Sequence, residues 1–423
     1  MIIIIIKTSK NSIFNYSLII VLFNLNIQKQ EVSKIRYFIW GDRLSFWTFN
    51  LAVWIVFILI FNKVNQPRVY SKSIFAILVL LILTFYRWNL IIFYLMFEIS
   101  IIIVLRIIIT WGYQPERVEA ALFIIIMTIL TSLPFLIRII NNITRLNLWN
   151  IQYIRVNAWE YSRLILVFII KMPTIFLHMW LPKVHVESPV QGSMILASIL
   201  LKLGSYGLIR VTSINSELNR KLEWIIMAFS IWTTFIITII CFIQTDLKTI
   251  IAYSSIVHIT IVFAAITLNK TKAMIGRIYI IVGHGTCSAG LFYISNIMYK
   301  RSKSRRIIIN KGIFSITPTA RILWFFMCIR NSPIPPSINV MGEFFSFKSA
   351  LNWSGTNLII IIMTTIIFTR SLYRIFIFYI ITHRIFKKSI TDIRNFNSKN
   401  MNISIIHIIP IILISINPDL LTI

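Results

Sequence analysis

Acidic residues are scarce in this sequence: Asp and Glu together number 13, against 42 Lys and Arg. Charged residues make up only 13% of the chain, about half of the ~25% that is usual in soluble domains. No polar stretch is long enough to fold as a separate soluble domain. The shortage of charge therefore excludes an ordinary soluble enzyme and indicates an integral membrane protein.

Cysteine is also rare. Cys241, Cys287 and Cys328 lie in three separate apolar stretches, and no CxxC spacing occurs. Zinc and iron–sulfur sites need several Cys or His ligands at characteristic spacings. We therefore expect no metal or cluster site built by this chain alone, and we interpret the cysteines as small buried residues.

The N-terminus, MIIIIIKTSK, lacks the features of a targeting peptide. Its apolar run is too short for a signal peptide, no cleavage site follows, and it is not an Arg-rich amphipathic transit peptide. Isoleucine stands where leucine would be usual, and Asn and Lys are frequent, which is typical of an AT-rich gene. These features predict a chain made inside an organelle or a bacterium.

Long apolar runs are abundant: 57% of the residues are hydrophobic, and the mean hydropathy is +0.82. Runs of about 17–25 residues, which can cross a bilayer as helices, recur from end to end. The sequence predicts an all-α polytopic transmembrane bundle of about thirteen helices, some of them broken, forming one membrane domain over residues 1–423. The expected spans are 13–27, 46–62, 73–87, 88–111, 117–140, 161–181, 190–211, 222–243, 247–268, 273–298, 319–348, 357–381 and 403–417.

The formal net charge of +29 does not indicate nucleic-acid binding. The basic residues gather in short loops, chiefly 300–311 and 384–399. Basic loops of this kind set the orientation of a membrane protein and contact anionic lipids. We expect lipid contacts and no nucleic-acid partner.

Residues 171–210 carry the strongest functional signal. Lys171 and Lys202 each lie within an apolar stretch, and a loop at 181–189 is expected between the two stretches. Pro173 cannot donate a backbone hydrogen bond, so it should free a carbonyl near Ile169. Charge beside a broken helix at membrane depth is tolerated where it lines protein or water, which predicts an ion path.

Structural alternatives exist for these residues. A lysine near a helix end can extend its ammonium group to the interface. Gly204 and Gly207, just after Lys202, either loosen the helix or allow close packing. The sequence therefore leaves open whether the lysines line a path or reach the interface, and whether the glycines loosen the helix or allow close packing.

Glu98 lies ten residues after Trp88 in the span 88–111, or about 15 Å along a helix that rises ~1.5 Å per residue. This depth is near the middle of a bilayer core of about 30 Å. A carboxyl group at that depth either stays protonated or pairs with a cation such as Lys171. Arg106, eight residues further on, is either a local counter-ion or an end charge.

Further candidates lie in the second half of the chain. Glu343 follows a break made by Pro333, Pro335 and Pro336, and is either a path residue or an end-of-helix charge. Three histidines within apolar sequence, at 178, 258 and 284, are possible proton relays, since imidazole titrates near neutral pH. A packed, hydrogen-bonded role is the alternative, and for His284 the flanking glycines permit close packing or a break.

The sequence contains the long motifs FEIS, WGYQPER and QTDLKTIIAYSSIVH, besides the stretch around Lys171 and Lys202. Together they resemble the chain 4 family of mitochondrial NADH–ubiquinone oxidoreductase, the antiporter-like proton-pumping subunits of respiratory complex I. The resemblance runs from about residue 42 to the C-terminus, with residues 1–41 divergent. It is carried by the motifs FEIS, WGYQPER, KMPTIFLHMWLPKVHVESPVQGSMILASILLKLGSYGLIRV, QTDLKTIIAYSSIVH, GHG, PPSINVMGE and NPD.

The resemblance implies antiporter-like inverted repeats and a place in the mitochondrial inner membrane, beside other antiporter-like subunits and lipids such as cardiolipin. It implies that proton translocation depends on Glu98, Lys171, Lys202 and Glu343, with His258 and His284 on a polar central axis. It also implies that the chain holds no cofactor, because NADH, FMN, iron–sulfur clusters and ubiquinone belong to other subunits.

The sequence departs from the family pattern in a few places. The first helix looks reduced, the proline that usually follows the Glu98 motif is absent, and Arg106, Arg277 and Arg330 are unexpected. Rival interpretations are a free-standing cation/proton antiporter, a redox subunit that binds haem or quinone, and a structural scaffold of the membrane arm. The buried acidic and basic residues argue against the scaffold.

Overall fold

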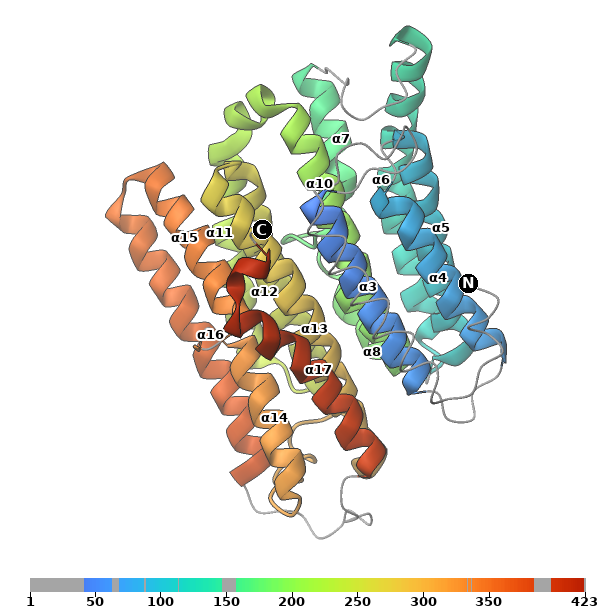
Figure 1. Ribbon diagram of the computed structural model, residues 1–423, viewed down its shortest axis with the longest axis vertical. Coiled ribbons are helices and arrows are strands. Elements are labelled where there is room, and N and C mark those ends of the chain that lie inside the picture. The colour runs from blue at the N-terminus through green and yellow to red at the C-terminus, as the bar shows by residue number, and fades with distance from the viewer. Residues whose placement is uncertain are drawn as a thin grey trace.

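The computed structural model describes residues 42–62, 68–86, 89–112, 114–146, 157–332, 334–335, 337–383 and 397–421. Helices dominate these ranges, as expected for an all-α transmembrane bundle (Figure 1). The first expected span, 13–27, the divergent segment 1–41 and most of the basic segment 384–399 lie outside the described residues. The helices are α3 (Arg43–Phe61), α4 (Arg68–Tyr86), α5 (Leu90–Trp111), α6 (Arg117–Leu146), α7 (Ala158–Lys171), α8 (Trp180–Glu187), α9 (Val190–Ile195), η2 (Leu196–Leu200), α10 (Leu201–Ile214), α11 (Ser216–Ile243), α12 (Leu247–Leu268), α13 (Thr271–Ser302), α14 (Pro318–Asn331), α15 (Ile338–Ser354), α16 (Asn357–His383), α17 (Ser398–Ile416) and η3 (Pro418–Leu421).

Ten helices in the described ranges are long and apolar enough to cross a membrane, counting α9, η2 and α10 as one continuous span. Each corresponds to an expected span, and α12 begins and ends at the expected residues. The two remaining expected spans, 161–181 and 319–348, are the ones in which prolines predicted a break. The structure divides them into α7 with α8 and α14 with α15.

The break after α7 follows from Pro173. The helix ends at Lys171, and the chain passes through Phe176 at a positive φ of 70° before α8 begins. The carbonyl of Ile170, adjacent to the expected position, accepts a hydrogen bond of 3.1 Å from Nε1 of Trp180. The expectation of a loop at 181–189 was wrong, because residues 180–187 form α8, with His185 and Glu187 buried.

The span with Lys202 is irregular before the lysine and regular after it. Residues 196–200 form the π-helical turn η2, and α10 continues through both glycines. A Cβ on Gly204 would lie 2.9 Å from Cβ of Lys171, and one on Gly207 would lie 2.1 Å from the Phe168 ring. The glycines therefore allow α10 to pack closely against α7, and they do not break the helix.

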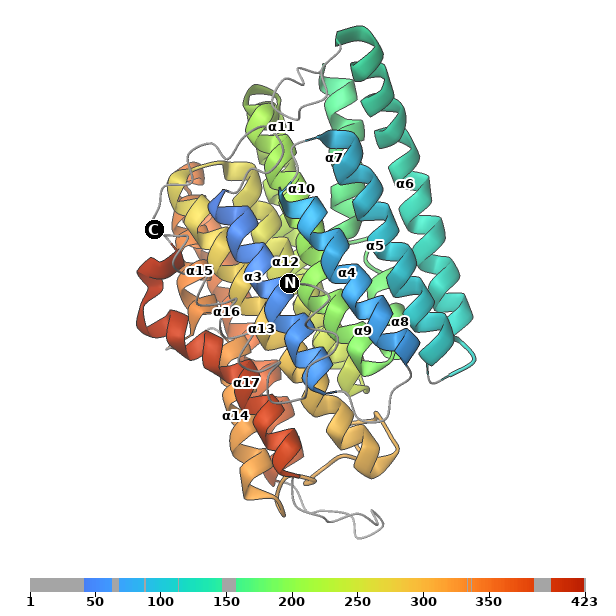
Figure 2. The same ribbon diagram turned by 45° about the vertical axis from the view of Figure 1, so that its right-hand side comes forward.

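The helices are arranged so that three groups lie side by side. Figure 1 shows α4, α5 and α6 on the right, α15 and α16 on the left, and α12 and α13 between them, and Figure 2 shows α17 crossing the outside of α13. The most enclosed spans are α13, α12 and the continuous span of α9, η2 and α10, whereas α16 and α17 are largely exposed. Close contact of α13 with α15 is possible because Gly276 faces Gly342, where a Cβ on Gly276 would lie 2.8 Å from the Gly342 carbonyl oxygen.

Candidate functional site

One end of the candidate site is built by α5 and α7. Lys171 is buried at the last residue of α7, where the proline break begins, and its ammonium nitrogen lies 5.0 Å from the centre of the Phe97 ring. Glu98, the next residue on α5, is near enough to interact electrostatically with Lys171. Its Oε1 atom is buried without a hydrogen-bond partner. The structure thus brings Glu98 and Lys171 together as expected, without closing them into a hydrogen-bonded pair.

Lys202 lies at the start of α10 and points toward α13. Its ammonium nitrogen donates to the carbonyl oxygen of Ala197 at 2.5 Å and lies 3.0 Å from Nδ1 of His284. Ala197 belongs to the π turn, where the backbone pattern is looser and its carbonyl is accessible to this side chain. Lys202 and His284 are both almost fully buried, so the interface alternative for Lys202 was wrong.

His258 on α12 lies between His284 of α13 and Glu343 of α15. The rings of His258 and His284 lie 4.8 Å apart, centre to centre. Nδ1 of His258 is 3.1 Å from Oε1 of Glu343, and Arg370 of α16 donates to the same oxygen at 2.5 Å. Glu343 lies in the first turns of α15, after the proline break, and is buried. It is therefore not an exposed end-of-helix charge.

We call these buried residues together the charged axis: the pair Glu98 and Lys171, and the contact series Lys202, His284, His258, Glu343 and Arg370. Lys171 packs against α10 at Gly204, two residues after Lys202, where a Cβ on the glycine would lie 2.9 Å from Cβ of Lys171. A cavity lined by Lys171, Leu196 and Leu200 extends from the first lysine to the π turn. Lysine, histidine and glutamate side chains can each take up or release a proton, so the arrangement can pass protons between groups inside an apolar bundle.

Other candidates lie away from this series. His178 is buried between α7 and α8 against Tyr253, with ring centres 6.0 Å apart. Among the described residues it makes no hydrogen bond to Lys171, His258 or His284, and only His258 and His284 of the three histidines lie side by side. Arg106 is exposed on the outside of α5, which favours the end-charge interpretation.

The unexpected arginines Arg277 and Arg330 are both buried. Arg330 donates to the carbonyl oxygen of Ile408 on α17 at 2.9 Å. It therefore attaches α14 to α17 and does not contact the charged axis.

Three basic residues of the buried interior were missed from the sequence. Lys248 was expected at the interface, yet it is buried and donates to the carbonyl oxygen of Ser188 at 3.0 Å. Arg370 and Arg374 were not singled out, although both interrupt the apolar span 357–381. Their spacing of four residues, which places them on one helix face, was the available signal.

A polar cluster closes one end of the bundle, outside the spans. Glu187 at the end of α8 lies 3.6 Å from Nη1 of Arg305, and the Arg305 carbonyl oxygen accepts from the backbone N–H of Leu247. Burial raises the pKa of the Glu187 carboxyl, and the nearby positive charge of Arg305 opposes that rise. The cluster fixes the segment after α13 against the start of α12.

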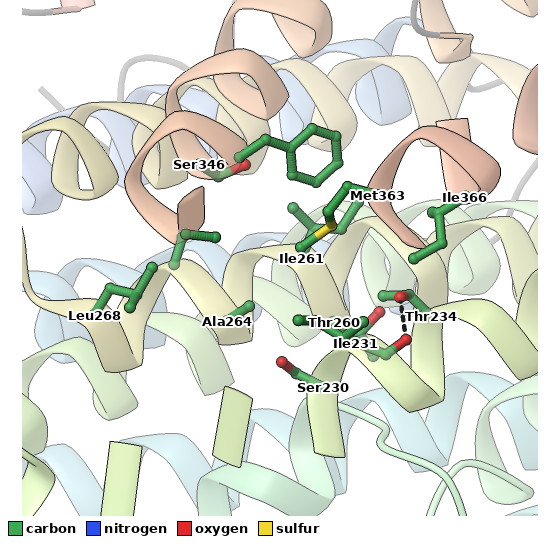
Figure 3. Close-up of a pocket in the computed structure, with 13 residues that line it drawn as sticks. Ser230, Ile231, Thr234, Thr260, Ile261, Ala264, Leu268, Ser346, Met363 and Ile366 are labelled. Carbon is green, nitrogen blue, oxygen red and sulfur yellow. Dashed lines mark hydrogen bonds between the residues drawn. The ribbon is translucent and has the colours of Figure 1, made fainter. Parts of the chain in front are cut away.

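A pocket between α11, α12, α15 and α16 lies beside the charged axis (Figure 3). Its lining is mainly apolar, and its hydroxyl groups bond to nearby carbonyls of their own helices, as Thr234 does to Ile231 at 2.6 Å. None of its lining residues is charged. The pocket therefore does not extend the axis.

The three cysteines are buried and unpaired with one another. Within the described ranges, no group of three or more His, Cys, Asp or Glu side chains is placed to hold a metal ion.

Comparison with known proteins defines the class to which this fold and axis belong. Residues 88–369 match the family described as NADH:quinone oxidoreductase/Mrp antiporter, TM. NADH-ubiquinone oxidoreductase chain 4 of Ceratitis capitata is 38% identical over 359 residues, which cover 82% of this chain and 80% of that protein. The protein of the same name from Polypterus ornatipinnis is 33% identical over 427 residues, covering 96% and 93%. The chain belongs to the NADH-ubiquinone oxidoreductase chain 4 family.

The fold agrees with this membership. A chain in the structure of respiratory complex I from Thermus thermophilus superposes with a TM-score of 0.81 at 19% identity, covering 90% of this chain and 82% of the other. At that identity the likeness concerns the fold.

Proposed function

We propose that this chain is a proton-translocating membrane subunit of respiratory complex I, acting while electrons pass from NADH to ubiquinone in other subunits. The observation that carries the proposal is the contact series from Lys202 through His284 and His258 to Glu343, buried inside a chain of this family. Ionisable groups inside membrane spans are costly and mark ion paths when they face the interior of the bundle.

Each residue of the axis then has a role. Lys171 is the switched proton carrier and Glu98 its ion-pair partner, which come together and separate as the coupled complex turns over. Lys202 is the relay, His284 and His258 conduct toward α15, and Glu343 is the exit-side site. His178 is a less direct candidate, because it touches Tyr253 and not the axis.

The energy available to such a switch is large enough to move protons. Two unit charges at about 4 Å interact by ~4 kcal/mol at an effective dielectric constant near 20. A factor of ten in a proton-binding constant corresponds to ~1.36 kcal/mol. Closing or opening the Glu98–Lys171 pair therefore changes proton binding at Lys171 by roughly three powers of ten.

The proposal places the chain in the mitochondrial inner membrane as a single membrane domain, next to other antiporter-like subunits of the membrane arm and to lipids such as cardiolipin. NADH, FMN, iron–sulfur clusters and ubiquinone are bound by other subunits. The alternative function is that of a free-standing cation/proton antiporter, because the matched family includes antiporters as well as oxidoreductase subunits. Co-purification of the chain with a large redox assembly supports the complex I subunit, and isolation of an active single chain supports the antiporter.

The direct test uses membrane vesicles that carry the assembled complex with Lys171→Ala in this chain. Quinone reductase rate and proton uptake are recorded together. We expect assembly to persist while proton uptake and coupled turnover collapse. Normal values of both, at the normal ratio, would show that the lysine is structural.

A further inference from the structure

Two arginines close the charged axis on α16. Arg370 and Arg374 lie within a 27-residue helix and are 0% and 3% exposed. A buried charge that lacks a partner is strongly destabilising, so two guanidinium groups at this place must be matched by the groups around them. The facing polar groups are Glu343 from α15, His258 from α12 and Asn331 from α14, with His284 of α13 behind His258.

Arg370 determines the charge of Glu343. Its Nη2 atom donates to Oε1 of Glu343 at 2.5 Å. A guanidinium group cannot be deprotonated in a protein, so the partner that matches it is the carboxylate anion. The same oxygen also accepts from His258, whereas Oε2 is buried without a hydrogen-bond partner. Glu343 therefore differs from Glu98, which stands opposite a lysine that can release its proton.

Arg374 determines the tautomer of His258. Its Nη2 atom lies 2.8 Å from Nε2 of the imidazole. Arginine offers only donors, so in this contact Nε2 accepts and the ring proton resides on Nδ1. From there it is donated to Glu343 at 3.1 Å. Oδ1 of Asn331, 2.9 Å from Nε2, receives no proton in this state. Nη2 of Arg370 also lies 3.2 Å from Nδ1 and 3.3 Å from Nε2, but its shortest contact is with the carboxylate.

We propose that Arg370 and Arg374 are positioning residues that hold Glu343 as a standing anion and His258 as a neutral imidazole protonated on Nδ1. His258 then gains and loses the transported proton at the exit-side site, and Glu343 contributes its fixed negative charge there. This inference rests on the proposed function and specifies which atom carries the proton.

The surroundings of Nε2 fit this role. A proton that arrives from the His284 side adds to Nε2, and Arg374 must then withdraw from that nitrogen. A cavity lined by Arg374, Asn331 and Ser254 gives the guanidinium group room to move. Oδ1 of Asn331, 2.9 Å from Nε2, is placed to accept the new N–H bond. When the proton leaves toward the α16 side of the axis, the N–H bond to Asn331 is lost and the Arg374 contact to Nε2 is restored.

The test is infrared difference spectroscopy of the assembled complex during turnover, combined with proton uptake. In the unaltered complex we expect Glu343 to give no protonated-carboxyl signal. The Glu343→Gln variant should therefore show the same carboxyl bands as the unaltered complex. Arg370→Met should create such a signal, because Glu343 then binds a proton, and Arg370→Lys should not. The matched control is Arg330→Met, which removes another buried arginine that does not touch Glu343 and should create no signal.

Arg374→Met provides an independent readout. With ring-labelled histidine, its spectrum should show His258 taking up a proton at higher pH than in the unaltered complex, and the pH profile of proton uptake should move with it. A protonated-carboxyl signal in the unaltered complex that Glu343→Gln abolishes would overturn the inference, even if no arginine variant assembles. That result leaves the proposed function intact, because the proposed function fails only if Lys171→Ala pumps normally.

Discussion

Replacing His284 with alanine tests whether the buried contacts are used in sequence. Nδ1 of His284 is 3.0 Å from the Lys202 ammonium nitrogen, whose other hydrogen-bond partner within the described ranges is the Ala197 carbonyl oxygen. A hydrogen bond to a charged group contributes about 1.5–3 kcal/mol, and ~1.4 kcal/mol is a factor of ten in an equilibrium constant. Loss of this partner should lower the population of protonated Lys202 by roughly 10- to 100-fold.

The assay is proton uptake and quinone reductase activity in vesicles that carry the assembled complex. If every transported proton visits Lys202, both rates should fall by about one to two powers of ten. The matched control is His407→Ala on α17, which removes another fully buried histidine, one that lies against Tyr293 and outside the axis. A complex with His284→Ala that assembles and pumps as fast as the His407→Ala control would refute the sequential route.

Two further predictions concern the packing that holds the axis in place. Gly207→Ala should destabilise the α7–α10 contact by about 1–3 kcal/mol, the usual cost of overpacking, because its Cβ would overlap the Phe168 ring. Thermal unfolding of the complex measures this loss. An unchanged unfolding midpoint contradicts the prediction. Trp180→Phe should lower the free energy of unfolding by about 1–3 kcal/mol, because it leaves the buried Ile170 carbonyl unpaired. The same thermal unfolding assay tests this. An unchanged stability would mean that another donor replaces the indole.

The helical bundle could be predicted from the sequence because bilayer thickness fixes the length of apolar runs. α12 matches its expected bounds, and the spans with Pro173 and with the cluster from Pro333 to Pro336 break as expected. Pro134 in α6 and Pro410 in α17 lie inside continuous helices. The sequence indicated a freed carbonyl near Ile169. The acceptor seen, the adjacent Ile170 carbonyl, finds its partner in Trp180, which depends on how the chain continues after the proline. The role of Gly204 could not be predicted either, because glycine is used both where a helix is flexible and where two helices pack closely.

The charged axis could be predicted in part. Glu98, Lys171, Lys202 and Glu343 were recognised because ionisable groups inside apolar runs are conspicuous. Their pairing could not be derived, because it depends on which helices are neighbours. Lys248 shows the limit most clearly: its place near a helix start suggested the interface, but the end of α8 covers it and provides carbonyl oxygens as acceptors.

The π turn at residues 196–200 also sets the direction in which the side chains of α10 point relative to those of α9. A π turn accommodates one residue more than an α-helix would over the same hydrogen-bond closure. Each residue of an α-helix advances the direction of its side chains by about 100°. Removing a single residue from this turn would therefore rotate all of α10 relative to α9 by that angle. Lys202 would turn away from His284 while Gly204 left Lys171, so one inserted residue aligns both the proton relay and the helix contact.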